Sequence, residues 1–336
     1  MVDIDLLPLV YSVDDKLGIK DIRSPKLDIN WYDLSKIQDY MKKNNIWSAI
    51  YGGKDYHFKF SHIKSKPYIY YRMGDIDLLH KKTIGVVWPR TPTTYGKKIV
   101  SELLSHLTHY DVATVSGLAD GIDMLTHTQS IKNNIPTIAV LGGGFHHFLK
   151  TKKSIIDDII SHGWLVISEF KLLSKPSAFT FPQRNRIIAW LSDVLFLPEW
   201  GVSSGSLITV DFALSGHKPV FATPNQIRSA SSQWVNKLIS SWEVTAVRDL
   251  LSWAEDQFSK YKKDKDNQTC SIDSSVICDP KHRKILEVIA SDGSVDIDRI
   301  ISKTQMDYSD VIVALSMLEI TGNIIQNTPG IYEIWR

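Results

Sequence analysis

The stretch TIGVVWPRTPTTYG, Thr83 to Gly96, decides the fold, because a β-branched run passes into a loop and then into an amphipathic helix. The helix is predicted from apolar side chains that recur at one-turn spacing and form a single stripe: Ile99, Val100, Leu103, Leu104 and Leu107. A strand, a loop and a helix in this order make a βα unit. The loop of such a unit can hold an anion on main-chain N–H groups. Pro89, in the middle of this loop, has no N–H to donate.

The same alternation continues to about Pro224. Five more short apolar runs are predicted to be strands: VATVS (112–116), TIAVL (137–141), WLVIS (164–168), VLFLP (194–198) and PVFAT (219–223). Continuous apolar runs fit strands that are covered on both faces, and helical patterns lie between them. The sequence therefore predicts an α/β fold, a Rossmann-like parallel sheet with helices on both faces.

Four regions are expected along the chain. Residues 1–80 are predicted to form a small, mostly helical N-terminal region with a short strand, and residues 81–253 to form the Rossmann-like domain. Residues 254–280 are interpreted as a linker, because their composition is too polar and charged to form a core. Residues 281–336 contain three helical patterns and a hairpin around Asn-Thr-Pro-Gly, which predicts a winged-helix domain.

Composition limits the function classes. Lysine and arginine number 39 against 37 acidic residues, so a polyanion has to be bound by a local patch. The chain lacks a signal-peptide pattern and an apolar run of membrane-spanning length, so we expect a cytoplasmic protein without membrane contact. Cys270 and Cys278 have no histidines at zinc-ligand spacing and are interpreted as free thiols. Neither a metal nor a cofactor is expected.

Four loops at the carboxyl ends of the predicted strands carry glycine and hydroxyl residues. They are residues 88–96, 116–123, 142–144 and the segment PEWGVSSGSLIT, 198–209. Open α/β sheets bind ligands at this edge. Glycine lets an anion approach the main chain, and helix N-termini favour negative charge. Each loop taken alone also fits a tight connection or a simple N-cap.

The segment PSAFTFPQRNRIIAWLSD, 176–193, combines aromatic and basic side chains. Phe179 and Phe181 are followed by Arg184 and Arg186. Guanidinium groups beside exposed rings suit single-stranded nucleic acid, because bases stack on the rings and cations follow the phosphates. The alternative is that both phenylalanines are buried and the arginines are solvated.

The predicted winged-helix domain argues against simple binding in the DNA major groove. The helix that would enter the groove, residues 308–321, has no Lys or Arg but contains Asp310 and Glu319. Phosphate and base contacts rely on basic and amide side chains. A protein-interaction or packing role is therefore favoured for this domain.

In their order along the chain, these motifs resemble the DNA-processing protein A family, also called Smf. The matching motifs lie within about residues 55 to 228: RTPTTYG, VSGLADGIDMLTH, TIAVLGGG, FPQRNRIIAWLSD, SSGSLIT and VFATPN. The resemblance implies a Rossmann-like domain that binds single-stranded DNA and forms a homodimer. It also implies a non-enzymatic mediator that protects the strand and helps to load a RecA-type recombinase in natural transformation.

The set of residues predicted to bind DNA or phosphate combines the family motifs with the aromatic and basic segment. It is Arg90, Tyr95, Gly96, Ser116, Gly117, Gly121, Lys175, Phe179, Phe181, Arg184, Asn185, Arg186, Ser204, Gly205 and Ser206. Arg90, Arg184 and Arg186 are expected to converge on the phosphates. No catalytic residue is predicted.

Three positions depart from the family pattern, and each change weakens the attraction for phosphate. Trp88-Pro89 stands where Gly-Ser is usual, Asp120 where arginine is frequent and Ser203 where a basic residue is frequent. We expect Arg90 to hold the anion through its side chain in place of the missing N–H. Trp88 is expected either to stack on a base or to close the pocket.

Two other functions stay open from the sequence. Rossmann-like relatives hydrolyse nucleoside monophosphates with a glutamate that follows a Gly-rich loop, whereas the corresponding segment here supplies Asp211. The second alternative is a nucleotide-binding sensor that no longer binds DNA.

Overall fold

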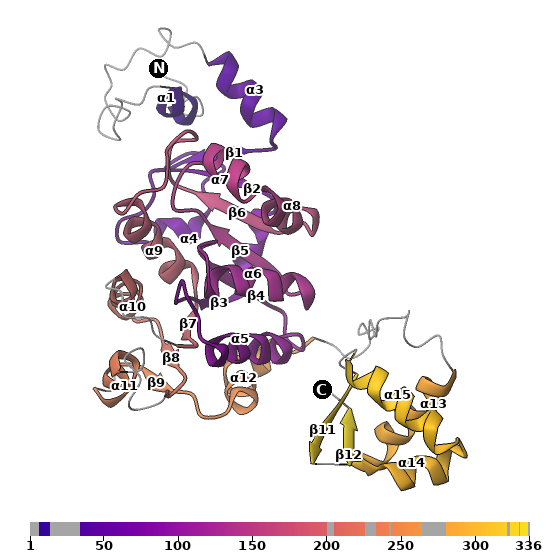
Figure 1. Ribbon diagram of the computed structural model, residues 1–336. Coiled ribbons are helices and arrows are strands. Elements are labelled where there is room, and N and C mark those ends of the chain that lie inside the picture. The colour runs from indigo at the N-terminus through magenta and orange to yellow at the C-terminus, as the bar shows by residue number, and fades with distance from the viewer. Residues whose placement is uncertain are drawn as a thin grey trace. The chain divides into compact units, whose positions relative to one another are not determined.

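The computed structural model describes residues 7–13, 34–199, 205–225, 233–241, 243–263, 280–320, 323–328 and 330–334 (Figure 1). Two compact units make up the chain, Met1–Lys263 and Asp264–Arg336. Cys270, Cys278, Ser203 and Ser204 lie outside the described residues. Among the described helices, none is both long enough and apolar enough to cross a membrane.

A nine-stranded sheet forms the centre of the first unit, in the order β1-β2-β6-β5-β4-β3-β7-β8-β9. The strands are β1 (Trp47–Ile50), β2 (Ile69–Met73), β3 (Lys82–Val86), β4 (Val112–Ser116), β5 (Thr137–Val140), β6 (Leu165–Ser168), β7 (Val194–Leu197), β8 (Val220–Ala222) and β9 (Thr245–Ala246). All pairs from β6 across to β9 are parallel. The six predicted strands are present to within one residue at each end, so the predicted parallel α/β sheet is confirmed.

Helices cover both faces of the sheet (Figure 1). One layer contains α5 (Thr94–Leu107), α6 (Ile122–Lys132), α8 (Lys153–Ser161) and α12 (Leu250–Phe258), and the other contains α9 (Thr180–Leu191) and α10 (Gly205–Ser215). Residues of β3 alternate between the layers: Ile84 and Val86 pack with the α5 side. Gly85 lies against Ser192 at the end of α9. The strands are continuously apolar because both of their faces are buried.

The shorter helices lie around these layers. They are α1 (Leu7–Val13), α3 (Ser35–Lys43), α4 (Phe58–Ser61), η3 (Ile76–His80), α7 (Phe145–Thr151), α11 (Gln233–Ser240) and η4 (Ser259–Tyr261). Residues 34–80 also contribute two strands, where the sequence predicts one short strand. β1 pairs with β2, and β2 pairs with β6, all antiparallel. The N-terminal region therefore extends the sheet of the Rossmann-like domain.

The first unit continues past the domain boundary predicted at residue 253. Ala254 and Phe258 of α12 are fully buried, and the Phe258 ring lies 5.8 Å from the Trp253 ring and 6.1 Å from the Tyr110 ring. The apolar residues of this helix recur at one-turn spacing among charged ones. The average composition of this segment did not reveal these apolar residues, because an average does not distinguish the two faces of a helix.

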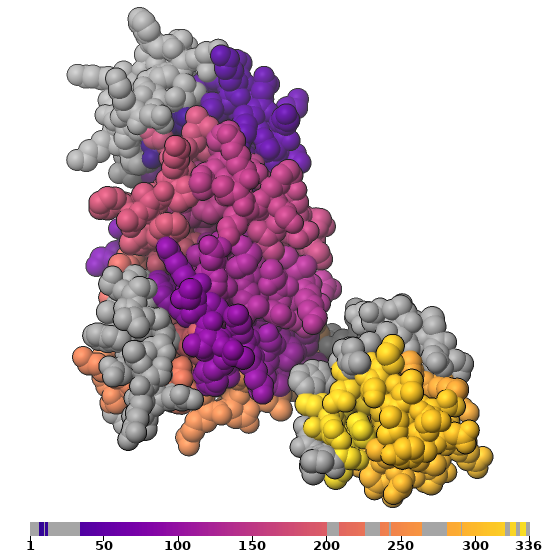
Figure 2. Space-filling view, in the orientation of Figure 1, coloured from indigo at the N-terminus to yellow at the C-terminus, as the bar shows by residue number. Residues whose placement is uncertain are grey.

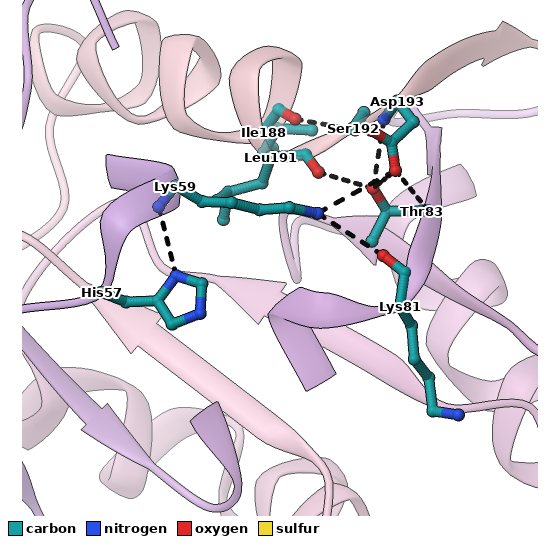
Figure 3. A network of polar contacts seen from close by, with 8 residues as sticks. All are labelled: His57, Lys59, Lys81, Thr83, Ile188, Leu191, Ser192 and Asp193. Carbon is teal, nitrogen blue, oxygen red and sulfur yellow. Dashed lines mark hydrogen bonds and ion pairs between the residues drawn. The ribbon is translucent and has the colours of Figure 1, made fainter. Parts of the chain in front are cut away.

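A polar network closes the amino ends of β3 and β7 (Figure 3). The main-chain N–H of Thr83 donates to the Asp193 carboxylate at 2.9 Å, and the N–H of Asp193 donates to the Thr83 hydroxyl oxygen at 3.1 Å. Lys59 from α4 lies 3.9 Å from the same carboxylate. Burial lowers the pKa of Lys59, and Asp193 opposes that shift. The network therefore joins α4 to the sheet through groups that satisfy one another.

The second unit contains three helices and a small antiparallel sheet. The elements are α13 (Pro280–Asp292), β10 (Val295–Asp296), α14 (Ile297–Thr304), α15 (Tyr308–Ile320), β11 (Ile324–Thr328) and β12 (Ile331–Ile334). The sheet order is β10-β12-β11. Ile285, Ile300 and Leu318 are among the residues that form its core. The expected three helices and hairpin are present, and the winged-helix assignment stays a prediction.

Candidate nucleic-acid interface

Arg184 of α9 lies beneath the surface at the carboxyl ends of the parallel strands. The residue is 3% exposed. Its Nη1 donates to the main-chain oxygens of Gly117 and Val140, at the ends of β4 and β5. Its Nε donates to Oδ1 of Asn185 at 3.1 Å, and its Nη2 lies 3.9 Å from the Asp123 carboxylate. The guanidinium therefore fastens two strand ends to α9.

Asp123, at the start of α6, is the acidic partner of this arginine. Its carboxylate is buried, and the main-chain N–H of the preceding residue, Ile122, donates to the oxygen of Pro89 at 3.0 Å. Burial raises the pKa of Asp123, and the charge of Arg184 opposes the rise. Burial lowers the pKa of Arg184 to about 10, so the guanidinium stays protonated at neutral pH. The pair draws the loops after β3 and β4 together.

Ser116 and Asn185 lie at the same depth. Ser116 is fully buried and its Oγ donates to the main-chain oxygen of Val86 at 2.6 Å, and Asn185 is 6% exposed. We call Ser116, Asp123, Arg184 and Asn185 the buried layer. Ser116, Arg184 and Asn185 were predicted to contact DNA, and the structure places their side chains in the interior, where they bind groups of the chain itself. Their contact with DNA stays a prediction. In the structure these side chains hold the loops at the carboxyl ends of the strands in position.

The glycines of this edge make room for the protein's own atoms. A Cβ atom on Gly117 would lie 2.1 Å from Nη1 of Arg184, and one on Gly142 would lie 2.7 Å from Cδ1 of Phe181. Gly121 has φ +91°, and a Cβ there would lie 2.1 Å from the main-chain oxygen of Pro89. The fold itself requires glycine at these positions. These close contacts explain the glycines by the fold alone, and the approach of an anion to the main chain stays a prediction.

The N-terminus of α5 already has an acidic partner, Glu199, which follows β7. The buried Glu199 carboxylate accepts hydrogen bonds from the N–H of Thr93 at 2.7 Å and from its hydroxyl at 2.5 Å. A Cβ on Gly96 would lie 2.4 Å from Cδ of Glu199. Helix N-termini favour negative groups, and here the chain supplies one. Sequence reasoning missed Glu199, although an acidic residue directly after an apolar strand could have indicated it.

A second set of predicted residues faces solvent, and we call Arg90, Lys175, Phe179 and Phe181 the exposed rim. The Arg90 guanidinium lies 4.8 Å from the centre of the half-buried Phe181 ring. Phe179 is 83% exposed, and Arg90 and Lys175 are exposed. No carboxylate forms an ion pair with Arg90 in the described part of the chain. Figure 2 shows the purple segment after β3 beside the pink segment that leads into α9, on one face of the molecule.

The other predicted residues lie in different environments. Arg186 is half-buried and pairs with Glu169, which follows β6. Tyr95 is 40% exposed, and its hydroxyl donates to the main-chain oxygen of Pro224 at 3.1 Å. Gly205 and Ser206 begin α10. The three arginines predicted to converge therefore differ: Arg184 is buried, Arg186 is paired and Arg90 is exposed.

Two of the departures from the family pattern have structural partners. Trp88, joined to Pro89 by a cis peptide bond, is half-buried and packs against the hydrophobic core. Whether its ring stacks on a base or closes the pocket stays a prediction. The Asp120 carboxylate binds the ammonium group of Lys152. This hydrogen bond and the charge of Lys152 lower the pKa of Asp120, and the pairing offsets part of its repulsion of phosphate.

Comparison with known proteins identifies the family to which this chain belongs. Residues 47–255 match the family described as DNA recombination-mediator protein A. The DNA processing protein of Bacillus subtilis is 38% identical over 195 residues, which cover 58% of this chain and 66% of the relative. That of Streptococcus pneumoniae is 35% identical over 199 residues, which cover 59% of this chain and 70% of the relative.

Two solved structures have the same fold. The crystal structure of DNA processing protein A from Streptococcus pneumoniae superposes with a TM-score of 0.63 and 28% identity, and covers 77% of this chain and 98% of its own. The protein of the same name from Helicobacter pylori, described for its single-stranded DNA binding mode, superposes with a TM-score of 0.57 and 23% identity. That match covers 64% of this chain and 97% of the other.

Proposed function

The chain belongs to the DNA recombination-mediator protein A family, and we propose that it binds single-stranded DNA at the exposed rim. One observation carries the proposal: Arg90 stands over the Phe181 ring without a carboxylate partner among the described residues. Phe179, two residues before Phe181, is 83% exposed. An exposed ring near a cation is a surface on which a base can stack while the cation meets a phosphate. The single-stranded DNA binding of the Helicobacter pylori relative supports the same choice of ligand.

The exposed rim contacts the DNA strand, and the buried layer holds the loops of the rim in place. Arg90 neutralises a backbone phosphate by its side chain, which explains how the loop tolerates Pro89. Phe179 offers a face on which any base can stack, so the binding is independent of sequence. Arg184 and Asp123 hold the rim loops in position from below. The strand therefore meets a preorganised surface, and little ordering entropy is lost on binding.

We also propose that the protein works as a homodimer without catalysis and passes the strand to a RecA-type recombinase during natural transformation. The family description as a recombination mediator supports this step. Light scattering measures the dimer. Recombinase loading is measured as faster filament formation by RecA on strands bound by this protein than on strands bound by the Arg90→Ala variant. Equal filament formation with both proteins argues against the loading role.

The test of strand binding is fluorescence anisotropy with labelled oligo-dT over a range of salt concentrations. Arg90→Ala is expected to weaken binding about tenfold and to flatten the salt dependence, because one charge-assisted phosphate contact is lost. Lys132→Ala is the matched control, since Lys132 is an exposed lysine in the last turn of α6, at the opposite edge of the sheet. Absence of binding at low salt contradicts the proposal.

The two alternative functions gain no support from the comparisons. Asp211, the acidic residue of the hydrolase alternative, is exposed on α10. The matched family is a recombination mediator. Nucleotide binding that does not depend on strand length is the result that would revive them.

A further inference from the structure

Residues 51–72 concentrate positive charge and aromatic rings that the proposed site does not use. Five residues in this segment are basic and one is acidic: Lys54, Lys59, Lys64, Lys66 and Arg72 against Asp55. The difference, five minus one, is larger than the formal net charge of +2 of the whole chain. Lys59 pairs with Asp193 at the amino ends of β3 and β7, so it does not add to the charge at the carboxyl edge. Without Lys59 the segment still has four basic residues against one acidic residue, and such an excess of cations attracts a polyanion.

One cation and two rings of this segment repeat the arrangement of the exposed rim. Nζ of Lys66 lies 4.7 Å from the centre of the Tyr51 ring, and the matching distance from Arg90 to Phe181 is 4.8 Å. Tyr51 is 41% exposed, and its ring lies 6.4 Å from the Tyr68 ring. A lysine that leans over an exposed ring offers a phosphate contact beside a stacking surface.

Both arrangements lie at the same edge of the sheet. Tyr71 of β2 pairs with Ser168, the last residue of β6, in the antiparallel direction. Tyr68 precedes β2 and therefore extends beyond the carboxyl end of β6. The main-chain N–H of Tyr51 donates to the oxygen of Tyr68 at 2.8 Å, which keeps Tyr51 at this edge too. In Figure 1, β1 and β2 continue the sheet beyond β6.

Tyr56 adds a third ring to the group at Tyr51. The Tyr56 ring lies 5.4 Å from the Tyr51 ring and 5.4 Å from the Tyr70 ring. Burial raises the pKa of Tyr56, Tyr70 raises it further, and the charge of Arg186 lowers it. Aromatic rings therefore gather where the chain leaves β1.

We propose that Tyr51, Lys66 and Tyr68 form a second subsite for the DNA strand that is bound at the exposed rim. The inference rests on the proposed function. Five steps separate β3 from β1 in the sheet order. At about 4.8 Å for each step this edge is about 24 Å long, which corresponds to about seven stacked nucleotides at ~3.4 Å each. A strand shorter than this reaches one subsite, and a longer strand reaches both.

The experiment compares strands of about 4 and about 20 nucleotides, bound to the full chain and followed by fluorescence anisotropy. Tyr51→Ala combined with Lys66→Ala is expected to weaken the long strand about tenfold and to leave the short strand within about twofold. Arg90→Ala is expected to weaken both strands. Tyr51→Phe keeps the stacking face and should bind both strands like the wild type.

A charge reversal guards against misfolding, because Lys66→Glu leaves both rings in place. Lys132→Glu makes the same change in charge at the other edge of the sheet and serves as its control. A loss for the long strand in Lys66→Glu alone supports the subsite. Wild-type binding of the long strand by both Tyr51→Ala/Lys66→Ala and Lys66→Glu overturns the subsite and leaves the proposed function intact. Failure of the wild-type protein to bind either strand overturns both.

Discussion

The buried layer and the exposed rim lie at one edge of one sheet and each contains an arginine, yet the two arginines differ in what they contact. Arg184 in the buried layer bonds to two main-chain oxygens and faces Asp123. Arg90 in the rim leans on a phenylalanine ring and is exposed. Residue type and motif position indicate where a site lies. Burial then distinguishes side chains that hold the loops in place from side chains that can contact DNA. Substitutions in the buried layer should therefore lower stability, and substitutions in the exposed rim should lower the affinity for single-stranded DNA.

The largest expected effect is on folding. Arg184→Ala leaves the buried Asp123 carboxylate without its cation and two main-chain oxygens without their donor. Loss of one partner of a buried pair costs about 3–5 kcal/mol. The free energy of unfolding, measured by urea denaturation, should fall by that amount. Arg90→Ala serves as control and should change it by less than about 0.5 kcal/mol.

The opposite pattern would break the comparison. If Arg184→Ala keeps the stability of the wild type and loses affinity for single-stranded DNA, the guanidinium contacts the strand directly. The buried layer would then belong to the binding surface.

A smaller loss of stability is expected from Gly117→Ala. The added Cβ would lie 2.1 Å from Nη1 of Arg184, so either the arginine or the strand end has to shift. Overpacking of this kind costs about 1–3 kcal/mol. Thermal unfolding followed by circular dichroism measures it. If Gly117→Ala unfolds at the same temperature as the wild type, Arg184 can move without loss of stability. That result would argue against the buried layer as a rigid support for the loops.

Sequence reasoning predicted the strands of the parallel sheet well, because a short, continuous apolar run bounded by Gly, Pro, Ser or Asp is typical of a strand that is buried on both faces. It placed the candidate site at the carboxyl ends of the parallel strands, where open α/β sheets bind ligands, and this location stays a prediction. It could not separate Arg184 from Arg186 and Arg90. The partners of an arginine come from distant segments, such as Val140 and Gly117 for Arg184.

The missed features have the same cause. β1 was missed because its pairing with β2 is a tertiary contact within a segment of irregular pattern. Glu199 was not recognised as the acidic partner of Thr93, the N-cap of α5, because the two residues lie far apart in the sequence. Local pattern reports which face of an element is apolar, and it carries no information on which distant group fills a particular position.

For the rim, the prediction is a loss of affinity without a loss of stability. Phe179→Ala removes a ring that is 83% exposed, so its removal disturbs little packing. One stacked base contributes about 1–3 kcal/mol, so the affinity for oligo-dT should fall about tenfold. Phe179→Trp keeps a stacking face and is the matched control. Unchanged affinity in Phe179→Ala would remove this ring from the strand path.

The smallest expected effect concerns Asp120, which stands where the family often has arginine. If Asp120 acted alone, its neutralisation would remove a charge that repels the strand. Because Lys152 already binds this carboxylate, Asp120→Asn also releases an ammonium group near the rim. The pair is exposed on the Asp120 side, with 80% of that side chain accessible, so screening by solvent keeps the effect small. We expect the affinity for oligo-dT to rise about twofold at low salt and to return to the wild-type value at high salt.

The double variant Asp120→Asn/Lys152→Met separates the two charges. It removes the carboxylate and the ammonium group together, so its affinity should match that of the wild type. If the double variant binds as tightly as Asp120→Asn, the carboxylate itself repels the strand and the ion pair does not neutralise it. Exposure alone would then not be enough to identify the residues that affect DNA binding. A surface charge that is already in an ion pair would also change the attraction between Arg90 and the phosphates.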